Sequence, residues 1–192
     1  MAIQVDIGAE VKRGWELYKE NMVLLILTGV LMIILGAFSF GILAGPMLAG
    51  QFLIIQRLLK KDATVPAIPD VFKGFEHFLN TFLFILVIAI ISGVCSRILG
   101  VNAGGAVLGP IVSLGIMFVV FGKLSFSDAL KKIGQEISTG PFWMLVLTLV
   151  IAGFIGGAGI LLVGIGIFFT APLAMCISVC AYHSAYESVA SE

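Results

Sequence analysis

Two cysteines, a histidine and a glutamate near the C-terminus are the residues whose types and spacing come closest to a chemical site. They are Cys176, Cys180, His183 and Glu187, and in a helix this spacing places them on one face. Thiolate and imidazole groups suit zinc or copper. Because a helix rises about 1.5 Å per residue, that face extends about 16 Å, and one ion cannot touch all four side chains. We therefore interpret the cysteines as small packing residues and His183 as an interfacial side chain, and we predict no metal or other cofactor.

Arg97 is the one charged residue in the apolar region 78–122. It can contact a lipid phosphate or another anion, or it can act only as a helix-end anchor whose charge reaches the headgroups. The apolar segments contain no carboxylate, which argues against an acidic proton or sodium site. The sequence motifs of hydrolases, metalloproteases, phosphate-binding loops and dinucleotide-binding folds are absent too. The sequence therefore predicts that the protein is not an enzyme and has no catalytic residues.

The composition indicates a membrane protein. Hydrophobic residues make up 60% of the 192 residues and charged residues 11%, whereas about a quarter of the residues in soluble domains are charged. No Asp, Glu, Lys or Arg occurs in four runs, which are 21–56, 78–96, 98–122 and 137–186. Because a transmembrane helix needs about 20 apolar residues, these runs predict six spans. The expected spans are 22–40, 42–59, 78–96, 103–122, 142–160 and 162–181.

The basic residues fall on one side of these spans. All eleven except Arg97 lie before the first span or in the connections after the second and the fourth. The positive-inside rule then places both termini and these two connections in the cytoplasm. All eleven acidic residues share that side, so its net charge is near zero. This balance argues against nucleic acid as a partner and against a surface that binds anionic lipid strongly through its overall charge.

One pattern recurs three times along the chain. The repeats cover residues 5–60, 66–123 and 124–187. Each contains a short amphipathic segment, an apolar segment, a Gly-rich break and a second apolar segment with a proline near its start. Such a repeat indicates one supersecondary unit that is copied and packed against its copies. We therefore predict a single all-α membrane domain over residues 1–192, built from three helical hairpins with pseudo-threefold symmetry, each preceded by an amphipathic interfacial helix.

The amphipathic segments carry aromatic residues that we expect at the membrane surface. These are Trp15 in the first segment, Phe72 and Phe75 in the second, and Phe126 in the third. The apolar stripe of the first segment runs through Ile7, Val11, Trp15, Tyr18 and Met22. Asp70 can cap the second helix, and Ser125 with Asp128 resembles a capping box at the start of the third. The alternative is that these segments are the cytoplasmic ends of longer helices, packed on one another.

Small residues and prolines mark the non-cytoplasmic turns. Gly-x-x-x-Gly spacing lets helix backbones approach closely, and the glycines expected to do so are Gly45, Gly109 and Gly157. This spacing fits packing within a hairpin, which we favour because it recurs in every repeat, or a dimerisation face. The prolines Pro46, Pro110 and Pro172 each remove a backbone donor, and we expect them to kink the second helix of each repeat.

Three short motifs carry a resemblance to known proteins. They are Gly14-Trp15, the stretch Pro69-Asp70-Val71-Phe72-Lys73-Gly74-Phe75, and the tail in which Gly164-Ile165-Gly166 precedes Thr170-Ala171-Pro172-Leu173 and Ala181-Tyr182-His183. Together they resemble a broad group of uncharacterised bacterial six-span membrane proteins. That group includes the membrane domain attached to some glycerophosphoryl diester phosphodiesterases. The resemblance implies a multi-pass protein of the bacterial inner membrane. It implies no activity, because the phosphodiesterase active site belongs to a soluble domain that these residues do not include.

These patterns lead to two hypotheses about function. The first is a non-enzymatic inner-membrane protein that binds or organises lipid, a small hydrophobic molecule or a partner membrane protein, which could be a second copy of itself. The second is a subunit of a small-solute transporter or channel, with a path between the hairpins. Odd-numbered parallel repeats differ from the inverted repeats that many secondary transporters use, which favours the first hypothesis.

Overall fold

A computed structural model describes residues 6–99, 104–159 and 166–186 of the chain. Within these ranges every regular element is helical. The elements are α1 (Ile7–Glu20), α2 (Met22–Phe38), α3 (Ala44–Lys60), the 3-10 helix η1 (Ile68–His77), α4 (Phe78–Leu99), α5 (Gly104–Val120), α6 (Phe126–Glu136), α7 (Gly140–Ala158) and α8 (Ile167–Tyr186). The all-helical prediction is therefore confirmed.

The helices alternate in length along the chain, while the predicted threefold repeat stays a prediction. A polar or amphipathic helix precedes two longer helices three times in succession, as α1-α2-α3, η1-α4-α5 and α6-α7-α8. The six longer helices begin and end within a few residues of the expected spans. This agreement arises because an unbroken apolar run favours a helix, and glycine-rich or charged segments interrupt it.

The number of helices that can cross a membrane is smaller than the six expected. In the described part of the chain, two segments are long and apolar enough, Ile68–Val94 and Ile167–Tyr186. Helices α1 and α2 count as a third only if they form one span, and they are bent by 92° at their junction. The helices α2, α3 and α5 each contain 17 residues. At about 1.5 Å per residue each is shorter than a hydrocarbon core of about 30 Å.

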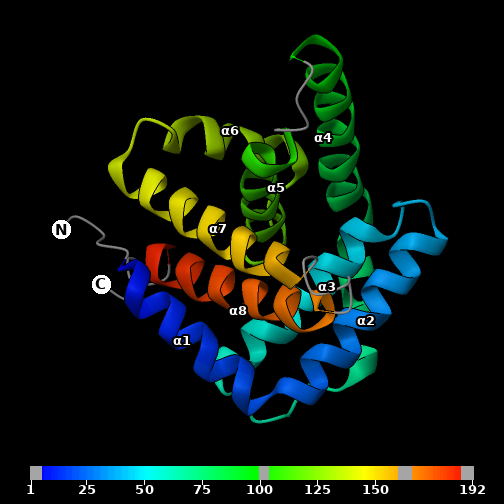
Figure 1. Ribbon diagram of the computed structural model, residues 1–192, viewed down its shortest axis with the longest axis vertical. Helices are drawn as coiled ribbons and strands as arrows, with labels where there is room; N and C mark the ends of the chain where they lie inside the picture. Colours follow the sequence, from blue (N-terminus) through cyan, green and yellow to red (C-terminus); the bar gives the residue numbers. More distant parts are fainter. Residues whose placement is uncertain (1–5, 100–103, 160–165, 187–192) are drawn as a thin grey trace.

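Helix α8 lies at the centre of the molecule. It packs between α7 and α1, and it also contacts α2, α3 and α5. In Figure 1, α7 and α8 run side by side across the middle, while α4 stands out at the upper right. The hydrophobic core is formed mainly by the second half of α5 and the second half of α8, with side chains of α3 between them.

The starts of the amphipathic helices have simple causes. The Asp6 carboxylate accepts hydrogen bonds from the backbone N–H groups of Gly8 and Ala9, which caps α1. At α6, the Ser125 hydroxyl accepts from the Asp128 N–H, as the expected capping box requires. Asp70 acts differently from the prediction: it stands third in η1 and its carboxylate accepts from the Ala67 N–H, so Ala67 is the N-cap residue.

A tight turn connects α2 to α3. Phe40 and Gly41 both have positive φ angles, of 52° and 87°. Gly41 adopts this left-handed conformation at no steric cost, whereas Phe40 does so with its side chain 98% exposed. Pro46 follows in the first turn of α3, where a helix leaves its N–H groups unbonded in any case. Pro110 and Pro172 lie inside α5 and α8, and the predicted kinks at the three prolines stay a prediction.

Glycines hold several helices at very short separations. A Cβ atom built at Gly45 would lie 2.7 Å from the Thr81 carbonyl oxygen, so α3 touches the backbone of α4 there, as expected. Gly14 brings α1 equally close to the backbone of α8 at Ile177. At Gly109 and Gly157, no described atom lies within 4 Å of such a Cβ atom. The close packing predicted for these two glycines was therefore wrong within the part of the chain that the structure describes.

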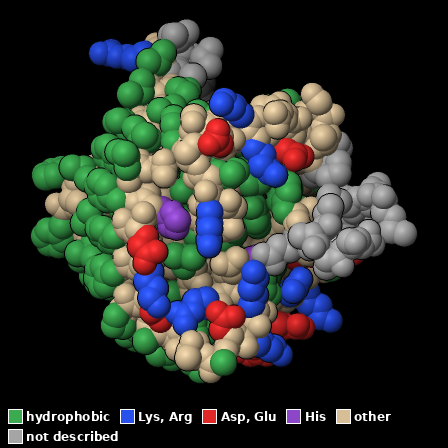
Figure 2. Space-filling view, turned by 180° about the vertical axis from the view of Figure 1, so that it is seen from behind, with side chains coloured by type: hydrophobic (Ala, Val, Ile, Leu, Met, Phe, Trp, Pro, Cys, Tyr) green, Lys and Arg blue, Asp and Glu red, His purple; other side chains and the backbone are tan. Residues whose placement is uncertain are grey.

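The surface separates apolar from charged side chains. Figure 2 shows apolar side chains gathered over the left side of the molecule and most charged side chains over the lower and right-hand parts. The exposed apolar residues come mainly from α2 with its following turn, α4 and α7, and include Phe38, Ile42, Ile90, Leu147 and Phe154. The charged residues come mainly from α1, the end of α3, η1 and α6 and from the connections beside them, whereas Arg97 stands at the end of α4. Such segregation is expected of a protein that is partly inserted in a membrane.

Candidate functional site

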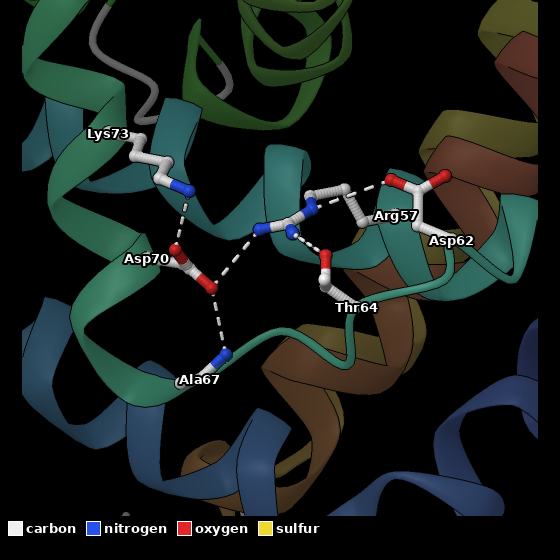
Figure 3. A network of polar contacts seen from close by, with 6 residues as sticks. All are labelled: Arg57, Asp62, Thr64, Ala67, Asp70 and Lys73. Carbon is white, nitrogen blue, oxygen red and sulfur yellow. Dashed lines mark hydrogen bonds and ion pairs between the residues drawn. The ribbon is translucent and has the colours of Figure 1, made fainter.

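The connection between α3 and η1 is held by a closed set of charges. Asp70 receives a hydrogen bond from the Arg57 guanidinium at 3.1 Å and pairs with the Lys73 ammonium at 2.7 Å (Figure 3). Arg57 also donates to the Thr64 hydroxyl at 2.9 Å and lies 3.5 Å from the Asp62 carboxylate. The charges of this network satisfy one another. We therefore assign it the structural task of folding the connection against the end of α3.

A second group of residues forms a pocket at the end of the helical core. The pocket has a volume of about 250 Å³ and lies between the end of α5, α6 and the end of α8. Its lining residues are Phe118, Phe121, Gly122, Leu124, Lys132, Tyr182 and Tyr186. Aromatic rings form most of the wall, and the ammonium group of Lys132 supplies the single positive charge of the lining. This combination can hold an anionic group beside an apolar one.

The aromatic wall is packed edge to face. The Phe118 ring lies 5.6 Å from Tyr182 and 5.1 Å from Tyr186, and both pairs are close to perpendicular. Phe121 completes the wall at 5.2 Å from Tyr182. Ring pairs in this geometry attract each other beyond the effect of their buried area. The pocket is therefore lined by side chains that hold one another in place before any ligand arrives.

Lys132 is positioned over this wall by the aromatic rings themselves. Its Nζ atom lies 5.3 Å from the centre of the Phe118 ring and 5.6 Å from that of Tyr186. A cation over an aromatic face is attracted by the electron-rich π system. The neighbouring Lys131 is used differently, since its ammonium pairs with the Asp128 carboxylate at 3.6 Å. The two lysines therefore form a natural comparison: one faces the pocket and the other is exposed.

The position of α6 fixes Lys132. Ala129 and Ile133 bury one face of α6, and the Phe126 ring packs edge-on against the Phe84 ring of α4 at 4.8 Å. The Phe126 N–H donates to the Asn80 side chain, which ties the start of α6 to α4.

The cap of α6 also affects the ionisation of Asp128. The hydrogen bond from the Ser125 hydroxyl holds the pKa of the Asp128 carboxyl below its usual value, and Lys131 adds to this effect.

The seam between α1 and α8 contains a buried carboxylate that the sequence analysis missed. The Glu10 side chain is only 6% exposed, and its Oε1 atom accepts a hydrogen bond of 2.6 Å from the Ser184 hydroxyl. Its Oε2 atom is buried and has no hydrogen-bond partner within the described ranges, and the same holds for the Tyr18 hydroxyl. An ionisable group enclosed by helices is costly to bury and is a common mark of function in membrane proteins.

Glu10 was missed because the predicted apolar stripe of α1 does not include it, and of the residues on that stripe only Tyr18 is buried. The buried residues of α1 are Glu10, Gly14, Leu17 and Tyr18. Trp15, which we expected at the membrane surface, is 44% exposed, and the Lys19 ammonium lies over its ring. Gly14 was the available signal, because a glycine within a helix indicates the face on which another backbone approaches.

The possible metal ligands do not assemble into a site. Cys176, Cys180 and His183 are all buried along α8, so His183 is a core residue and not the wet interfacial side chain that we expected. No group of three or more His, Cys, Asp or Glu side chains that could hold a metal ion occurs in the described parts of the chain. Glu187, the fourth residue of the predicted face, lies outside the described residues. The two cysteines thus act as small side chains in the core.

The other candidate residues lie apart from each other. Arg97 is exposed in the last turn of α4. Phe72 is exposed on η1 and stacks near Phe75, which is partly buried against the core. Pro172 packs against α2, where a Cβ atom at Gly29 would lie 3.0 Å from its ring. None of these residues lines the aromatic pocket.

Comparison with known proteins adds no relative: no protein family, no curated protein and no solved structure matches the chain. The resemblance to the membrane domain of glycerophosphoryl diester phosphodiesterases therefore stays a prediction.

Proposed function

We propose that this chain is a non-enzymatic, multi-pass membrane protein that binds and organises lipid. The observation that carries the proposal is the separation of its surface: exposed apolar side chains cover α2, α4 and α7, and charged side chains cover α1, η1 and α6. A surface of this kind has one part suited to hydrocarbon and another suited to the headgroup region. A partner membrane protein or a second copy of the chain is the other ligand that the exposed apolar helices could accept.

The proposal includes an arrangement of the helices in the membrane. Six membrane-embedded helices in three hairpins would enter from the cytoplasmic side, with the charged end and both termini in the cytoplasm of a bacterium. The helices of 17 residues then need a locally thin bilayer or only partial crossing. The grouping of α1-α2-α3, η1-α4-α5 and α6-α7-α8 supports the three-unit arrangement.

Lipid binding and topology can each be tested directly. We expect the purified protein to carry phospholipid that native mass spectrometry detects, and we expect alkaline carbonate to leave it in the membrane fraction. Release by carbonate together with the absence of bound lipid would refute the proposal. For topology, reporter fusions at the C-terminus and at Asn102, which lies outside the described residues, should report opposite sides. A periplasm-specific reporter that is active at the C-terminus would refute the orientation.

The buried carboxylate of Glu10 favours a second candidate, a subunit of a solute transporter or channel. Ionisable groups enclosed in membrane proteins often lie on ion or substrate paths. If this function holds, Glu10→Gln should abolish proton-coupled flux into liposomes, while Glu16→Gln should not, because Glu16 is an exposed residue of the same helix. If the unaltered protein shows no proton-coupled flux, lipid binding remains the better proposal. The same conclusion follows if both variants keep the flux.

A further inference from the structure

We propose that the aromatic pocket beneath α6 binds the headgroup of an anionic phospholipid, with the Lys132 ammonium as the partner of the phosphate. This inference rests on the proposed function, since it assumes that the charged end of the molecule meets the headgroup region. It assigns to the pocket a ligand class that combines a negative charge with an apolar body.

The charge of Lys132 points to an anionic ligand. Lys132 makes no ion pair with the described residues, and only the faces of Phe118 and Tyr186 compensate its charge. Glu136 stands one turn further along α6, near enough to the Tyr186 hydroxyl for its charge to act on that group. Its carboxylate accepts a hydrogen bond from the Thr139 hydroxyl and, among the described residues, makes no ion pair with Lys132. The lining contains no acidic residue, so a phosphate in the pocket would be the anionic partner of Lys132. A hydrogen bond from an ammonium group to a phosphate oxygen is stronger than one between neutral groups.

The shape of the pocket suits the portion of a lipid that lies between phosphate and acyl chain. A volume of about 250 Å³ is below the usual range of about 300–1,000 Å³ for whole drug-sized ligands, so it fits part of a larger molecule. Gly122 is exposed at one edge of the pocket and has no side chain that could close the entrance. The Tyr186 hydroxyl in the lining can donate a hydrogen bond to a phosphate oxygen. The apolar rings provide contact surface for the glycerol backbone.

The location of the pocket selects a membrane lipid as the source of the phosphate. The pocket opens among the ends of α5 and α8 and the amphipathic α6, where Asp128 and Glu136 balance the charges of Lys131 and Lys132. The phosphate would therefore be recognised by Lys132 within the pocket, at the charged side of the molecule that would face the headgroups. A soluble phosphate compound would not need the aromatic wall, and this difference can be measured.

The test compares the two adjacent lysines of α6 in the full-length protein in detergent. Native mass spectrometry would follow the titration of phosphatidylglycerol, and we expect Lys132→Gln to weaken binding about tenfold, which corresponds to about 1.4 kcal/mol. Lys131→Gln removes the same charge from an exposed position and should change binding less than about twofold. Lys132→Arg keeps the charge and should bind within about threefold of the unaltered protein, and thermal unfolding of each variant checks that it folds.

Four results would overturn the inference. Equal weakening by Lys131→Gln and Lys132→Gln would mean that the general surface charge attracts the lipid. Binding that is unchanged in a folded Lys132→Gln protein, or equal binding of phosphatidylcholine, would remove the anionic site. Displacement of the lipid by inorganic phosphate at a similar concentration would make the ligand a soluble phosphate. These outcomes leave the general proposal of lipid binding intact, whereas a protein that carbonate releases and that holds no lipid would refute the proposed function itself.

Discussion

Helices α4 and α8 belong to the two segments that are long and apolar enough to span a membrane, but α4 is mostly exposed and α8 is mostly buried. In the most apolar stretch of the segment that contains α4, 12% of the residues are buried, against 56% in α8. The exposed segment is the more hydrophobic of the two, with a mean hydropathy of 2.2 against 1.5. In a bilayer, apolar surface gains little by leaving lipid for another helix. The comparison therefore teaches that small side chains and close contacts, more than hydropathy, identify the central helix.

The largest expected difference between the two helices concerns their isoleucines. Ile177 of α8 is fully enclosed, and Ile177→Ala should lower the free energy of unfolding by about 2–5 kcal/mol through lost contacts and a cavity. Ile90 of α4 is exposed, so Ile90→Ala should cost far less. Denaturant unfolding of both variants in detergent measures the difference. Equal losses would show that a partner or a second copy covers α4 in solution.

A glycine pair sharpens the same comparison. At Gly14, which faces α8, a Cβ atom would lie 2.7 Å from the Ile177 Cα atom, so Gly14→Ala should cost about 1–3 kcal/mol. At Gly93 in α4, no described atom lies within 4 Å, so Gly93→Ala should be neutral or slightly stabilising. Melting temperatures in one detergent provide the measurement. A larger loss at Gly93 would mean that α4, and not α8, is the closely packed helix.

Two threonines extend the test to hydrogen bonds. The Thr170 hydroxyl of α8 donates to the Gly156 carbonyl of α7 at 2.6 Å, so it joins two helices. The Thr81 hydroxyl of α4 donates to the His77 and Phe78 carbonyls one helical turn earlier in the chain, so it joins no second helix of the core. Thr170→Val should therefore lower stability by about 0.6–1 kcal/mol, and Thr81→Val by less. Chemical unfolding curves decide this, and the opposite order would contradict the assigned bond between α7 and α8.

Arg97 is expected to have the smallest effect. It is exposed at the end of α4, and Arg97→Ala should change the free energy of unfolding by about 0.5 kcal/mol or less. The variant can be compared with Gly14→Ala by thermal unfolding. If Arg97→Ala is the more damaging change, then Arg97 is paired in the native protein, and an anion or lipid contact at that position becomes the better explanation.

The positions of the helices were readable from the sequence because apolar runs and their breaks are local signals. The cap of α6 at Ser125 was readable for the same reason. The burial of Glu10, the exposure of Trp15 and the open surroundings of Gly109 depend on which helices meet, and a periodic pattern leaves that undetermined. The aromatic pocket was missed because its residues come from α5, α6 and α8, whose adjacency is a tertiary property. The expected exposure of His183 was wrong because α8 lies at the centre of the molecule.

The contact between α1 and α8 has a consequence for biosynthesis. The hydrogen bond from Ser184 to Glu10 joins residues 174 positions apart, so α1 leaves the ribosome long before its partner α8 has been made. Until then the face of α1 that bears Glu10 and Gly14 lacks α8, the helix against which it mainly packs. Contacts between distant residues form slowly, because the intervening chain must be brought together first. A nascent chain that stops before α8 therefore exposes the Glu10 carboxylate, which is buried in the folded protein. Chaperones or proteases can use this exposed face of α1 to distinguish a chain without α8 from a folded one.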